Sequence, residues 1–74
     1  MKKNDFYIEI KEALELDDKT VNEKTPIHLS SLKILALIVL VDEKFEKQIK
    51  IINLKEVKTI SDLMTVIGTE NFTD

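Results

Sequence analysis

The first helical stretch is marked by apolar residues that recur every three or four positions, namely Phe6, Ile10, Ala13 and Leu14. Asn4 and Asp5 are both of the type that caps a helix N-terminus. Asp17 and Asp18 are short acids that compete with the helical backbone and are unfavourable at its C-terminal end. The pattern therefore predicts a helix from Asn4 or Asp5 to about Leu16.

A loop is predicted from Lys19 to about Leu29, with Pro26 inside it and Val21 and Ile27 as its apolar anchors. The second helix is predicted to start at Ser30, whose hydroxyl is of the type that accepts a hydrogen bond from first-turn amides.

This second helix carries two adjacent apolar stripes, one formed by Leu32, Leu35, Val39 and Phe45 and the other by Ile34, Ile38 and Val41. A helix that is apolar over so much of its circumference is expected to be buried from more than one side. Charged residues return at Asp42 to Lys47, and Ile49 closes the segment. We therefore expect this to be the central helix.

Residues 51–57 are predicted to form a short third helix, although the Ile51–Ile52 pair also suits a strand. Thr59 or Ser61 is expected to cap a last helix whose apolar stripe is Ile60, Leu63, Met64 and Ile67, and Gly68 is expected to stop it. Residues 69–74 are expected to form a frayed tail. The fold class predicted is all-α: one domain over residues 1–74, built as a small four-helix bundle with three main helices and one short helix.

Composition removes several functional classes. The chain has no cysteine, so disulfides and cysteine-based zinc sites are excluded, and all 11 basic residues are lysine in a chain of net charge -3. Without arginine or a basic excess, nucleic-acid binding, including a helix-turn-helix role, is not expected. The longest apolar run, Ile34 to Val41, is 8 residues, well short of the ~20 that span a bilayer. We expect a cytoplasmic, free-standing monomer without membrane insertion.

Self-contained catalysis is not expected either. His28 is the single imidazole, and although Ser30 and Ser31 lie near it in sequence, a loop histidine beside a helix cap is usually solvated or packed. One glycine cannot supply a phosphate-binding loop. The acids Asp17, Asp18, Asp42 and Glu43 do not follow a known metal-ligand pattern. The chain is therefore expected to be neither an enzyme nor a metalloprotein.

One constellation remains: a serine pair at the start of the most apolar helix. From Ser31–Leu32 the chain continues with Phe45 fourteen residues on and then Ile49, and it reaches a closing Val57, Thr59 and Ile60. This spacing resembles the acyl and peptidyl carrier protein family, and the string VDEKFEKQI of residues 41–49 is similar to that family's LEEEFDIEI. The resemblance covers nearly the whole chain.

The resemblance implies that Ser31 receives a 4′-phosphopantetheine group, whose thiol holds acyl, aminoacyl or polyketide units as thioesters. The implied partners are a phosphopantetheinyl transferase and acyl-transfer, condensing or adenylating enzymes of a specialised biosynthetic pathway. The implied acyl groove lies between the second helix and the short third helix.

The chain departs from the family in the residues around the serine. Ser30 stands where the family usually has aspartate, His28 where it usually has glycine, and Lys33 where an acid is common. Residues 24–58 carry seven lysines and four acids, a net charge of +3, whereas the family generally presents an acidic second helix. These departures leave open an alternative, in which the chain is an unmodified carrier-like bundle that acts as an interaction or scaffold module.

Overall fold

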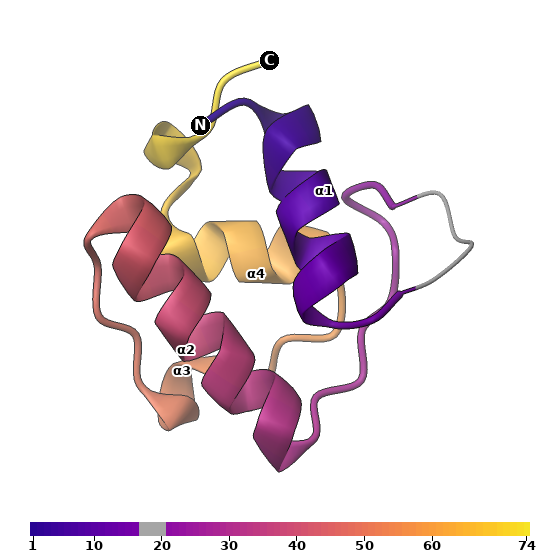
Figure 1. Cartoon of the computed structure of the whole chain (residues 1–74), viewed down its shortest axis with the longest axis vertical. Coiled ribbons are helices and arrows are strands. Elements are labelled where there is room, and N and C mark those ends of the chain that lie inside the picture. Colours follow the sequence, from indigo (N-terminus) through magenta and orange to yellow (C-terminus); the bar gives the residue numbers. More distant parts are fainter. Residues whose placement is uncertain (17–20) are drawn as a thin grey trace.

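A computed structural model describes residues 1–16 and 21–74 of the chain, and four α-helices form their fold (Figure 1). In chain order they are α1 (Lys3–Ala13), α2 (Ser31–Phe45), α3 (Ile51–Leu54) and α4 (Ile60–Ile67), followed by a single 3₁₀ turn, η1 (Thr69–Asn71). The described residues form no sheet. The predicted fold class, a compact all-α domain with three main helices and one short one, is confirmed.

The helices cross one another rather than running in parallel. In Figure 1, α4 passes behind α1 and α2, α3 lies beside the lower part of α2, and the N-terminus meets the C-terminal segment at the top. The N-terminus of α2 lies at the bottom, far from the two chain ends.

The core gathers one stripe from each long helix. Phe6, Ile10 and Leu14 of the first segment are almost fully buried, as their spacing predicts. The predicted stripe of α4 is buried at every position, namely Ile60, Leu63, Met64 and Ile67. The remaining buried apolar residues are Ile27, Leu37, Leu40, Val41, Ile49, Leu54, Val57 and Phe72.

The expectation that α2 is buried on more than one side is wrong. Its buried residues are Leu37, Leu40 and Val41. In contrast, three members of the first predicted stripe are exposed: Leu32 by 79%, Leu35 by 58% and Val39 by 47%. One flank of the helix packs on α1, α3 and the core, and the flank that carries Leu32, Leu35 and Val39 faces solvent.

The predicted limits of α1 are also corrected. The helix begins at Lys3 without a capping side chain, because the Lys3 amide donates to the Thr73 carbonyl oxygen at 2.8 Å. It ends at Ala13. Asp17 and Asp18, the predicted stop, lie outside the described residues.

The end of α1 is closed by the backbone. The Leu16 amide donates to the Lys11 carbonyl oxygen at 2.9 Å, and the Glu15 amide donates to that of Glu12 at 3.3 Å, with Glu15 at φ 54°. This hydrogen-bond pair is the Schellman arrangement, which usually places glycine where Glu15 stands. Glu46 ends α2 at a similar positive φ of 52°.

The short third helix covers Ile51–Leu54, less than the predicted 51–57, and a turn then buries Val57. Thr59 caps α4 as expected: its hydroxyl accepts from the Asp62 amide at 3.2 Å, and the Asp62 carboxylate accepts from the amides of Lys58 and Thr59. These bonds, chiefly the one from Lys58, lower the pKa of Asp62 below its usual value. Gly68 ends α4 at φ 113°, a region that side chains rarely adopt.

The expectation of a frayed tail is wrong. The Thr73 amide donates to the Met1 carbonyl oxygen at 2.9 Å, and the Met1 ammonium donates to the Asn71 carbonyl oxygen at 2.9 Å. Lys3 pairs with Asp74 at 3.1 Å, and this contact raises the pKa of the Lys3 ammonium. The tail is ordered because it continues the backbone pairing at the start of α1.

Three phenylalanines join the tail to the helices. The Phe72 ring lies 4.8 Å from the Phe6 ring and 5.3 Å from the Phe45 ring, centroid to centroid, and the Phe6 and Phe45 centroids are 6.1 Å apart. All three pairs meet edge to face, the arrangement that the aromatic quadrupole favours. Through this cluster the tail fills a gap between α1 and the end of α2.

Replacing Glu15 with glycine is expected to stabilise the domain by about 1 kcal/mol, since a left-handed residue with a Cβ is strained by about that amount. The matched control is Glu12→Gly, which puts the same substitution inside α1 and is expected to cost about 1 kcal/mol. Urea unfolding of both variants measures the difference. Equal destabilisation by both would show that α1 does not end at this turn.

Replacing Phe72 with alanine is expected to cost about 3–5 kcal/mol of unfolding free energy, because the ring is a buried part of the aromatic cluster. Leu32→Ala removes an exposed side chain and is expected to stay within about 0.5 kcal/mol. Thermal and urea unfolding report both values. If Phe72→Ala proves as neutral as Leu32→Ala, the tail does not pack in solution.

Candidate functional site

The start of α2 is held in place by the loop before it. The Ile27 amide donates to the Lys58 carbonyl oxygen at 2.8 Å, and the amides of Ile60 and Ser61 donate to the carbonyl oxygens of Thr25 and Glu23. Ile27 itself is buried. The loop is therefore tied to the start of α4 only a few residues before α2 begins, which fixes where the serine pair emerges.

Ser30 is the N-cap of α2. Its backbone is extended, with φ -87° and ψ 171°, and its hydroxyl accepts a hydrogen bond from the Lys33 amide at 3.3 Å. Its carbonyl oxygen accepts the first helical bond, from Ile34. Serine caps a helix about as well as aspartate does. Serine at position 30 thus supplies the cap without adding a negative charge.

Ser31 is the first residue of α2 and is exposed. The amides of a first helical turn have no carbonyl partner one turn earlier, and the helix dipole is positive there. The first turn of α2 contains no acidic residue, and it contains Lys33. The Ser31 side chain therefore lies in water beside a field that favours a negatively charged substituent.

His28 does not complete a nucleophilic pair with these serines. It is exposed, and the hydrogen bonds found among the described residues include none between its ring and either hydroxyl. Residues 1–16 and 21–74 also contain no group of three acidic or histidine side chains that is able to hold a metal ion. Of the acids considered from the sequence, Asp17 and Asp18 lie outside this part of the chain.

A hollow of about 440 Å³ lies beside α2, and its nearest α2 residue, Ile38, is seven residues or ~10 Å beyond Ser31 at the usual helical rise. It lies between the C-terminal half of α2 and the segment that leads into α3. Its lining combines apolar, charged and amide side chains and consists of Ile38, Val39, Asp42, Glu43, Gln48, Ile49 and Lys50. The groove expected from the sequence lies between α2 and α3, whereas this hollow is lined by residues 48–50 and by no residue of α3.

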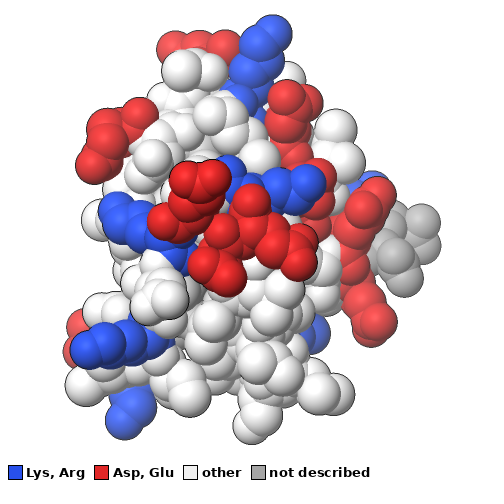
Figure 2. All heavy atoms as spheres, turned by 60° about the vertical axis from the view of Figure 1, so that its left-hand side comes forward, with Lys and Arg blue, Asp and Glu red and all other residues white. Residues whose placement is uncertain are grey.

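Next to the hollow lies an exposed apolar surface, which we call the α2–α3 face. It consists of Leu32, Leu35 and Val39 of α2 and of Ile51 and Ile52 of α3. The stripe on α2 was assigned to the core from its spacing, so sequence reasoning missed this surface. Figure 2 shows the lower half of the molecule as mainly uncharged, with lysine side chains at its edge and most of the acidic side chains above it.

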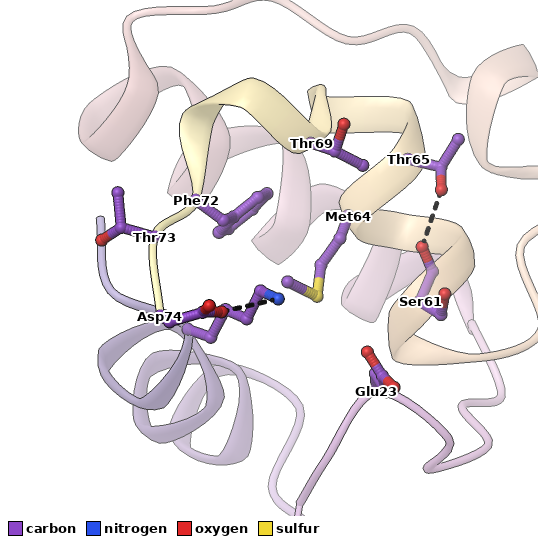
Figure 3. Close-up of a pocket in the computed structure, with 9 residues that line it drawn as sticks. Glu23, Ser61, Met64, Thr65, Thr69, Phe72, Thr73 and Asp74 are labelled. Carbon is purple, nitrogen blue, oxygen red and sulfur yellow. Dashed lines mark hydrogen bonds and ion pairs between the residues drawn. The ribbon is translucent and has the colours of Figure 1, made fainter.

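A second hollow of about 440 Å³ lies where the chain ends meet (Figure 3). Met64 and Phe72 point into it, and Ser61, Thr65 and Thr69 stand at its border, with the Lys3–Asp74 pair at one side. Its lining shares no residue with that of the hollow beside α2. The two hollows are therefore separate features of the surface.

Within the described residues, no helix has both the length and the apolar character needed to cross a membrane. Comparison of the chain with models of protein families, with curated proteins and with solved structures finds no match. The functional reading therefore depends on the residues and the geometry given above.

Proposed function

We propose that this protein is a carrier to which 4′-phosphopantetheine is attached through the Ser31 hydroxyl. The observation that carries the proposal is the difference between two adjacent serines. Both serines are exposed, but the Ser30 hydroxyl accepts the capping hydrogen bond from the Lys33 amide, whereas Ser31 is the first residue of the helix and takes no part in the cap. An attachment at Ser31 would leave the cap intact.

The surroundings of Ser31 suit a phosphodiester. The amides of the first turn and the helix dipole favour negative charge, and Lys33 adds a cation within the same turn. When bound, the group supplies a thiol on a long flexible arm that holds an acyl, aminoacyl or polyketide unit as a thioester. The chain itself contains no cysteine, so none of its own side chains competes with that thiol.

The hollow beside α2 supports a role in shielding the carried unit. Ile38, Val39 and Ile49 give the hollow an apolar part, and it begins about two helical turns along α2 from the attachment point. A flexible arm would also raise the local concentration of the carried unit at each partner's active site. The protein would supply the attachment site and a partly apolar hollow for the carried unit, and the partner enzymes would supply the catalytic groups.

The implied partners remain a phosphopantetheinyl transferase and acyl-transfer, condensing or adenylating enzymes. Lys33 and the net charge of +3 over residues 24–58 differ from the acidic surface that the family presents, so a dedicated set of partners is expected. The alternative, an unmodified interaction module, is favoured by the neutral Ser30, because the family's aspartate helps the transferase to hold metal and cofactor.

Loading by a broad-specificity phosphopantetheinyl transferase with coenzyme A tests the proposal. Intact-mass spectrometry is expected to show a phosphopantetheine-sized increase in the wild-type protein and in Ser30→Ala, and none in Ser31→Ala. No increase with any of several transferases would favour the unmodified module, and an increase that survives Ser31→Ala would show that the group is attached at another residue and would overturn the assignment to Ser31.

A second pair of variants tests the role of position 30. Ser30→Asp keeps the cap and restores the charge, and it is expected to load at least about tenfold faster, the effect of one charge-assisted contact. Ser30→Asn is the control, since it caps the helix without a charge. Equal loading rates for the two variants would show that the acid at this position does not matter for the transferase.

A further inference from the structure

One side of the hollow beside α2 is formed by a segment with very few hydrogen bonds. The lining residues outside α2 are Gln48, Ile49 and Lys50, and we call residues 47–50 the wall segment. Within residues 1–16 and 21–74, a single hydrogen bond joins residues 47–49 to the rest of the protein. The Lys47 ammonium donates it, at 2.7 Å, to the carbonyl oxygen of Ile67 in α4. The position of the wall segment therefore depends on this bond and on the burial of Ile49.

The bond places the Lys47 ammonium at the C-terminal end of α4. Ile67 is the last residue of that helix, where carbonyl oxygens lack amide partners and the helix dipole is negative. A lysine side chain satisfies both conditions there. The side-chain amide of Asn71 donates to the same carbonyl oxygen at 3.1 Å, so the end of α4 keeps a partner even without the lysine. The bond thus matters more to the wall segment than to α4.

The backbone of Glu46 turns the chain toward this contact. Glu46 ends α2 at φ 52°, a left-handed conformation that is unfavourable for a residue with a Cβ. Such a conformation persists where the surrounding contacts impose it. The contacts that follow directly are the bond from Lys47 and the burial of Ile49. At its far end the wall segment is held by the Lys50 amide, which donates to the Asn53 side chain at 2.9 Å.

We propose that Lys47 is a positioning residue for the hollow beside α2. Its bond to the end of α4 holds the wall segment at a fixed distance from Ile38 and Val39 of α2, and so limits the length of the acyl chain that the hollow admits. The inference rests on the proposed function only in taking an acyl chain as the occupant of the hollow.

NMR relaxation of the unmodified protein tests the position of the wall segment. Backbone order parameters of Gln48 and Ile49 are expected to be about 0.85 in the wild type and to fall below about 0.6 in Lys47→Met, which removes the donor and keeps an apolar stem of similar length. Lys47→Arg retains a donor and is expected to keep the wild-type values. Lys44→Met is the matched control, because it removes the ammonium that pairs with Glu9 at 3.7 Å on another side of α2.

Binding of free acyl thioesters tests the limit on chain length. The hexanoyl and decanoyl thioesters of N-acetylcysteamine are titrated into unmodified protein, and the NMR shifts of Ile38, Val39 and Ile49 are followed. The wild type and Lys47→Arg are expected to bind the decanoyl thioester no more tightly than the hexanoyl one. Lys47→Met is expected to bind the decanoyl thioester at least about fourfold more tightly than the hexanoyl one, the gain from one further buried methylene.

Three results would overturn the proposal. The first is that the order parameters of the wall segment do not change in Lys47→Met, and the second is that they fall equally in Lys44→Met. The third is the same chain-length dependence in the wild type and in Lys47→Met, including binding of neither thioester. Because both experiments use unmodified protein, a failure to load Ser31 would contradict the proposed function without changing these results. Circular dichroism of each variant confirms that the helices remain folded.

Discussion

The start of α2 depends on one side-chain hydrogen bond, which the Lys33 amide donates to the Ser30 hydroxyl at 3.3 Å. The bond satisfies one of the amides that every helix leaves without a partner at its N-terminus. It also distinguishes two exposed serine side chains, since only that of Ser30 takes part in the cap. Ser30 is held in the cap, and Ser31, one residue later, stands at the exposed first turn. The proposed carrier role follows from this division.

Contacts with the rest of the fold hold the first turn of α2 in place. The loop before α2 is joined to the start of α4 by backbone hydrogen bonds, and the far end of α2 is joined to α1 and the tail through Phe45. Both ends of α2 are therefore anchored, while one flank is left without a partner inside the domain. Leu37, Leu40 and Val41 are buried and Ile34, Ile38 and Phe45 pack against the core, so Leu32, Leu35 and Val39 remain exposed on the other flank.

Local patterns predicted the elements well where one stripe of apolar residues faced one core. The four apolar positions of α4, the Thr59 cap and the stop at Gly68 all follow from spacing and from capping preferences. For α2 the same reasoning failed, because every residue from Ile34 to Val41 is apolar, and the buried Leu37 and Leu40 belong to neither of the two predicted stripes. Periodicity cannot tell which stripe faces the core when the second one is apolar for another reason. Leu32 and Leu35 were therefore wrongly assigned to the core.

The tail and the helix ends depend on contacts that are distant in sequence. Residues 69–74 contain few apolar side chains and resemble a solvated end, and their order comes from the pairing of Thr73 with Met1 and Lys3 and from the packing of Phe72 on Phe6. No local signal reports such a contact. Glu15 and Glu46 have positive φ values at helix ends where glycine is usual, so the sequence does not mark the exact ends of α1 and α2. The position of Ser31 was predictable, because it needed only the cap preference at the serine pair.

The difference between the two serines can be measured directly as unfolding free energy in urea. Ser30→Ala removes the cap and is expected to cost about 1 kcal/mol, whereas Ser31→Ala is expected to change the value by less than about 0.5 kcal/mol. This is the result that the account predicts. A larger loss for Ser31→Ala than for Ser30→Ala would contradict it, since Ser31 would then be the residue that holds the helix and would not be free to carry a group.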